Sequence, residues 1–161
     1  MPETAKTASS VKKSKTANTA AKKSAEKTVK YSDKSAGQPE LIPIFETIKA
    51  LMKPYAKGTI VEQGGEGGMY GLISKKAVEI EGRKNDEVYF AGLLIQKGYV
   101  GFYFMPVYAE TELKKVFKPE LLKCLKGKSC FHIKRNDSAV MEQIGDALKA
   151  GYELYKEKGW V

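Results

Sequence analysis

The chain has 161 residues, of which 42% are hydrophobic, and its formal net charge is +9. This length suits one domain with a hydrophobic core and is short for two. The longest apolar run, residues 100–109, is about half of what a helix needs to cross a bilayer. We therefore expect no membrane segment, and a cytoplasmic protein whose two cysteines are reduced.

Residues 1–38 differ in composition from the remaining chain. They hold nine lysines against three acidic residues, with a single aromatic residue, Tyr31, so they carry +6 of the net charge and residues 39–161 carry +3. Such a segment cannot bury enough apolar area to offset the entropy of ordering. We predict a disordered Lys/Ala/Ser/Thr-rich tail over 1–38 and one folded domain over 39–161. The tail either contacts nucleic acid through its lysines or serves as a solubilising extension.

The first part of the predicted domain is helical. Hydrophobic residues recur at steps of three and four over 41–52, which indicates a helix with one buried stripe that Pro54 ends. Two short strands, over 59–63 and 69–74, flank a glycine-rich turn at 64–68. These glycines fit neither G-x-G-x-x-G nor G-x-x-x-x-G-K-[ST], so they do not predict a phosphate-binding loop.

Residues 87–108 form the densest block of aromatic, β-branched and glycine residues, and they predict a β-hairpin. We expect strands over 88–95 and 99–105, joined by a three-residue loop that ends in a glycine. This register pairs Ala91 with Tyr103. A two-residue loop would shift the pairing by one residue and regroup the side chains on the two faces.

Side chains alternate across a sheet, so the predicted register gives the hairpin two apolar faces. We expect one face to belong to the core: Val88, Phe90, Leu94, Val100, Phe102 and Phe104. The other face is richer in tyrosine, whose hydroxyl needs a partner or water: Tyr89, Ala91, Leu93, Ile95, Tyr99, Tyr103 and Met105.

The remaining pattern consists of short helices, one strand and a long helix. Residues 77–81 alternate as a half-exposed strand, and short helices are expected after Thr111 and Pro119. A last strand over 128–135 precedes a closing helix that starts near residue 138. Clustered strands between helices predict an α+β fold, an antiparallel sheet of about five to six strands with the N- and C-terminal helices packed on one face.

Three stretches resemble the YdhG-like family, a domain of unknown function: VYFAGLLIQKGYVGFYFMPVY, LKKVFKPELLKCLKGKSCFHIK, and the closing GYELYKEKGWV. The resemblance covers roughly residues 40–161 and implies an α+β sheet with terminal helices. Some members resemble frataxin and are regarded as intracellular iron chaperones, which implies iron held by acidic residues of the first helix and the adjoining strand. In this chain that helix offers Glu40 and Glu46, with Lys49, Lys53 and Lys57 beside them.

Cys130 and His132 are the best candidates for reactive chemistry, because they share one face of the last strand. Their Cα atoms would lie about 6 to 7 Å apart, which is long for a nucleophile and its base, and no third group orients the histidine. A metal site needs three or four ligands; Cys124 is near in sequence, but no C-x-x-C or H-x-x-x-H spacing supports such a site. The sequence therefore predicts no catalytic residue and no metal ligand, with iron the one cofactor left open.

The function predicted from these residues is binding. If the last strand lies beside the hairpin, Tyr89, Tyr103, Met105, Cys130 and His132 share a face that suits a small molecule or a peptide. Aromatic side chains on a sheet are also typical of base stacking, and helices or a partner subunit could instead cover them. We expect a non-enzymatic protein that binds a small ligand or a protein partner through this face. The alternatives are a frataxin-like iron chaperone and nucleic-acid association through the tail.

Overall fold

The computed structural model describes residues 32–161, of which residues 33–161 form one compact unit. Most of the predicted disordered tail, residues 1–31, lies outside the described range. The unit starts before the predicted boundary at residue 39, because Gln38 closes one end of the hairpin. Its side chain accepts a hydrogen bond from the N–H of Gly98 (2.7 Å) and donates one to the carbonyl of Gln96 (3.1 Å).

Six antiparallel strands form the main sheet, in the order β1-β2-β5-β6-β8-β7. Their bounds are β1 (Ile60–Gly64), β2 (Met69–Ser74), β5 (Val88–Gln96), β6 (Tyr99–Phe104), β7 (Leu125–Lys126) and β8 (Cys130–Ile133). A separate two-stranded sheet pairs β3 (Val78–Ile80) with β4 (Arg83–Asn85).

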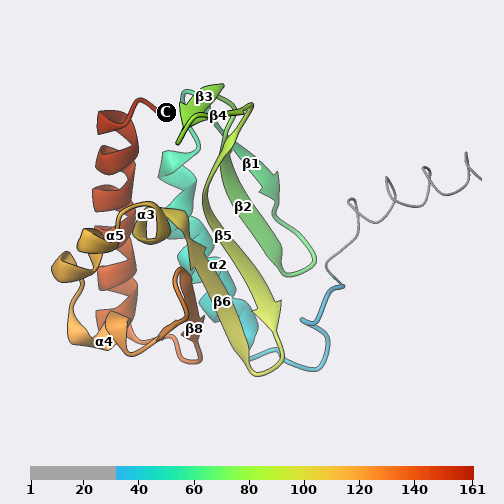
Figure 1. Cartoon of the computed structure of the whole chain (residues 1–161). Coiled ribbons are helices and arrows are strands. Elements are labelled where there is room, and N and C mark those ends of the chain that lie inside the picture. The colour runs from blue at the N-terminus through green and yellow to red at the C-terminus, as the bar shows by residue number, and fades with distance from the viewer. Residues whose placement is uncertain (1–31) are drawn as a thin grey trace, which may run out of the picture. The chain divides into compact units, whose positions relative to one another are not determined.

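Two helices, α2 (Leu41–Met52) and α5 (Ser138–Glu157), lie on the same side of the main sheet (Figure 1). The shorter helical segments are η1 (Lys53–Tyr55), α3 (Met105–Ala109), η2 (Thr111–Val116) and α4 (Pro119–Leu122). Asp137 caps α5, since its carboxylate accepts a hydrogen bond of 2.9 Å from the N–H of Ala139. The predicted α+β fold is confirmed. No helix of the described range is long and apolar enough to cross a membrane.

The register of the β5–β6 hairpin differs from the prediction by one residue. Gln96 pairs with Tyr99 and Gly92 pairs with Tyr103, so the connection has two residues, Lys97 and Gly98. The polar side chain of Gln96 suggested a loop, but its backbone continues the strand. Gly98 then turns the chain with φ of +87°, a conformation that glycine adopts without steric cost.

The two faces of the hairpin are regrouped accordingly. Three residues predicted on the tyrosine face, Ala91, Leu93 and Ile95, are at most 1% exposed and belong to the core. Leu94, predicted in the core, is half-buried on the opposite face. Phe90 is buried with Ala91, because β5 has an irregularity at this point: the ladder with β2 passes from Ala91 to Tyr89. The hairpin residues in the core are Val88, Phe90, Ala91, Leu93, Ile95, Val100, Phe102 and Phe104.

Candidate functional site

The sheet face turned away from α2 and α5 is the candidate binding surface, and we refer to it as the open face (Figure 1). Strand alternation and the observed register place seven side chains on its central part: Tyr89, Leu94, Gln96, Tyr99, Tyr103, Cys130 and His132. Tyr89 is 37% exposed and the other six are half-buried. Aromatic side chains are therefore accessible here, whereas those of the opposite face are fully buried under the helices.

Glycines in the strands leave room for two tyrosine rings to lie against the sheet. A Cβ atom on Gly92 would meet the Tyr89 hydroxyl oxygen at 1.8 Å, and a Cβ atom on Gly101 would meet Cε2 of Tyr103 at 2.9 Å. Gly71, which pairs with Gly92, is also in reach of the Tyr89 hydroxyl. Burial raises the pKa of Tyr89 and of Tyr103, so both phenols stay neutral at physiological pH.

Tyr99 and His132 form a stacked pair on the open face. Their ring centroids are 3.8 Å apart and their planes differ by 14°. The imidazole lies on β8 opposite Gly101, which has no side chain to compete for the space. Burial, followed by the charges of Lys126 and Lys134, lowers the pKa of His132 below 6.5, so its ring is neutral near pH 7.

Cys130 lies beside this pair, opposite Tyr103 in the ladder between β6 and β8. Burial raises the pKa of its thiol, and a hydrogen bond with Tyr103 opposes that shift. A neutral thiol next to a neutral imidazole is not the thiolate–imidazolium pair that nucleophilic catalysis by cysteine requires. The arrangement suits contact with a ligand better than covalent chemistry.

A hollow of about 280 Å³ opens at the β7–β8 edge of the sheet, and His132 forms part of its wall. Its charged lining residues are Lys123, Lys126, Lys134, Arg135 and Asp137, and we call it the basic hollow. Within residues 32–161, none of its four cations forms an ion pair. Four unpaired positive charges around one concavity attract anions from solution.

Met105 and Tyr89 belong to a different hollow, of about 590 Å³, between the β3–β4 hairpin, α3 and the C-terminal residues. Met105 was expected on a strand, but it is the first residue of α3, since Pro106 cannot continue the ladder. The five predicted site residues are thus divided. Tyr103, Cys130 and His132 come together as expected, and Tyr89 lies at the boundary of the two regions.

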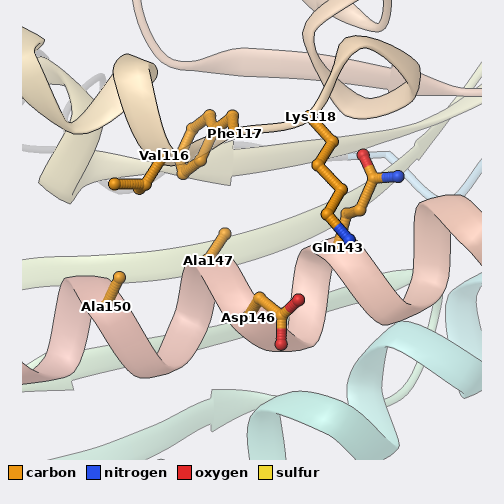
Figure 2. Close-up of a pocket in the computed structure, with 7 residues that line it drawn as sticks. All are labelled: Val116, Phe117, Lys118, Gln143, Asp146, Ala147 and Ala150. Carbon is orange, nitrogen blue, oxygen red and sulfur yellow. The ribbon is translucent and has the colours of Figure 1, made fainter.

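A third hollow, of about 150 Å³, separates α5 from the segment that precedes α4. Figure 2 shows Val116, Phe117 and Lys118 on one side and Gln143, Asp146, Ala147 and Ala150 on the other. Gln143 is occupied in holding α4: its carboxamide oxygen accepts from the N–H of Leu121 (3.0 Å) and its nitrogen donates to Glu120 (3.0 Å). The two hydrogen bonds of Gln143 tie α5 to α4, and the charged residues of this hollow are Lys118 and Asp146.

The cations of the basic hollow are candidate site residues that were not predicted from the sequence. Residues 118–135 contain six basic residues and one acidic residue, whereas residues 39–161 as a whole carry only +3. A local count of charge along the chain would have revealed the cluster.

Over residues 32–161, no group of three His, Cys, Asp or Glu side chains is placed to hold a metal ion. Comparison with protein-family models, with curated proteins and with solved structures finds no match to this chain.

Proposed function

We propose that the chain is a YdhG-like binding domain, without an enzymatic role, that holds a ring-containing ligand on the β6–β8 half of its open face. The observation that carries this proposal is the stacked pair of Tyr99 and His132, next to Tyr103, on a sheet face that the helices leave free. An aromatic surface of this kind gains about 25 cal/mol for each Å² of apolar area that a ligand removes from water.

The rings are also held in place before a ligand arrives. Stacking fixes His132 against Tyr99, and the ring of Tyr103 lies over Gly101. A ligand that docks on fixed rings loses less side-chain entropy than one that must order them, and this lowers the cost of binding.

The proposal is tested by titrating the ¹⁵N-labelled full chain with indole, benzoate and adenosine monophosphate, each alone, and following the amide resonances. Binding at the open face should shift the amides of Gly101, Tyr103 and His132 and leave those of α2 unchanged. The double variant Tyr103→Ala/His132→Ala should weaken the response.

Tyr108→Ala is the matched control, because Tyr108 is a tyrosine that is 54% exposed and lies on α3 outside this face. The proposal fails if none of the three probes shifts the β6 and β8 amides, or if the double variant responds as the control does.

A further inference from the structure

We infer that the open face binds single-stranded nucleic acid, with bases stacked on Tyr103 and on the Tyr99–His132 pair and phosphates held at the basic hollow. This inference rests on the proposed function, and it adds the class of ligand and the place of its charged groups.

The first support is the position of the charge. Lys126, Lys134 and Arg135 surround a hollow whose wall includes His132, one member of the stacked pair. Four of the five charged residues that line this hollow are cations and the fifth is Asp137, so a ligand that extends from the rings into the hollow meets a net positive charge. Phosphate groups attached to a flat ring match this arrangement, and a nucleotide has both.

The second support is the spacing across the sheet. Lys126 pairs with Cys130, and Cys130 pairs with Tyr103, so Lys126 and Tyr103 are two strands apart. Adjacent strands lie about 4.8 Å apart, which puts the two Cα atoms about 10 Å from each other. A lysine side chain can span most of this distance toward a phosphate whose base lies on the tyrosine ring.

The third support is the shape of the aromatic surface. Two ring positions follow one another along β6 and β8. Tyr99 and Tyr103 lie on β6 with Gly101 between them, and His132, which stacks on Tyr99, lies on β8 opposite Gly101. Single-stranded nucleic acid binds such platforms with successive bases, because every base has a flat face to stack. The bases of a duplex are paired and stacked on each other and cannot reach these rings, so the surface should distinguish the two forms.

Fluorescence anisotropy of the full chain with a labelled oligothymidylate of about 12 nucleotides tests the inference, since this length lies within the range of about 4–16 nucleotides that single-strand platforms bind. Lys126→Ala/Lys134→Ala removes two cations of the basic hollow. Lys53→Ala/Lys149→Ala is the matched control, because it removes the same charge from two exposed lysines of the helical layer. The tail is unchanged in both variants, so its contribution cancels in the comparison.

The variant at the hollow should bind several-fold more weakly than the control. Its slope of log affinity against log salt should be smaller by about 1.4, because each lost phosphate contact on a single strand contributes about 0.7. Tyr103→Leu should cost about five- to 150-fold, the range expected for stacking of one base. Tyr103→Phe keeps the ring and should retain the affinity of the wild type, which separates loss of stacking from loss of folding.

Equal affinities for the two lysine variants would overturn the inference and assign any binding to other parts of the chain. Equal affinity for the oligothymidylate and for its duplex with oligoadenylate would also overturn it. In either case, amide shifts caused by indole or benzoate would leave the proposed function standing with another ligand. If the oligonucleotide does not bind and neither indole nor benzoate shifts the amide resonances of the open face, both proposals are refuted.

Discussion

Gly151 lies in the interior of α5, and its replacement by alanine should destabilise the fold although alanine is the better helix former. A Cβ atom at this position would lie 2.4 Å from Cζ of Phe104 and 2.8 Å from Cγ of Pro106. Carbon atoms in contact are ordinarily about 3.5–4.0 Å apart, so α5 would have to move by about 1 Å. The neighbours cannot give way easily, because Phe104 is fully buried and Pro106 has a rigid ring.

Helix propensity and overpacking change the free energy of unfolding in opposite directions in this variant. Replacing a helical glycine with alanine gains about 0.5–1 kcal/mol, and overpacking a core costs about 1–3 kcal/mol. An overlap of this size belongs in the upper part of that range, so Gly151→Ala should lower the free energy of unfolding by about 1–2 kcal/mol. Urea denaturation, followed by the fluorescence of the single tryptophan, measures the change.

Gly145→Ala is the control on the same helix, because a Cβ atom there would meet only Cδ2 of Leu51, at 3.9 Å. It should keep the gain in helix propensity and stabilise the fold by up to about 1 kcal/mol. If Gly151→Ala were as stable as Gly145→Ala, the close packing of α5 on the end of β6 would be refuted.

Three further predictions use the same denaturation assay. Gln143→Leu should cost about 1–3 kcal/mol, because it leaves the buried N–H of Leu121 without its acceptor; an unchanged midpoint would contradict this role. Tyr155→Phe removes the hydrogen bond of 2.7 Å from a buried hydroxyl to the carbonyl of Tyr89 and should cost about 1 kcal/mol or more, whereas wild-type stability would show that this bond contributes nothing. The pKa of His132 is lower in the folded protein than in the unfolded chain. As the pH falls, the unfolded chain therefore binds a proton at a higher pH than the folded protein does, and the free energy of unfolding should decrease as the pH drops through about 6.5. His132→Gln should reduce this part of the pH dependence, and an unaltered pH profile would exclude the histidine as its source.

The helices and the fold class could be predicted from the sequence because the signals were local and repeated. The buried residues of α2, from Leu41 to Met52, follow the steps of three and four seen in the sequence. The hairpin register was wrong because it depended on one polar residue, Gln96, at the boundary between strand and turn. A shift of one residue moves the side chains of a strand to the opposite face. The error therefore put the stretch from Ala91 to Ile95 on the wrong faces, whereas the irregularity at Phe90 left Val88 and Phe90 in the core as predicted.

The candidate site could be predicted only in part, because its residues come from segments that are far apart in the sequence. Tyr103, Cys130 and His132 came together because β8 pairs with β6, and strand alternation was enough to give them one face. The Tyr99–His132 stack depends on the packing of two side chains across strands, and the basic hollow depends on where the chain turns after β8. The stack does not follow from spacing in the sequence, and a local count of charge would reveal the cations over 118–135 but not that four of them line one hollow.

The glycines of the strands connect the fold to the proposed binding surface. A glycine inside a strand weakens it, because it packs no side chain and loses more entropy on folding. The sheet nevertheless has Gly71, Gly92 and Gly101 in its strands, and tyrosine rings approach all three positions. A β-branched residue at Gly101 would give a stronger strand but would push Tyr103 away from the sheet. These glycines thus make the strands less stable, but they let the tyrosine rings lie close against the backbone. Rings in this position form the flat surface that a flat ligand needs.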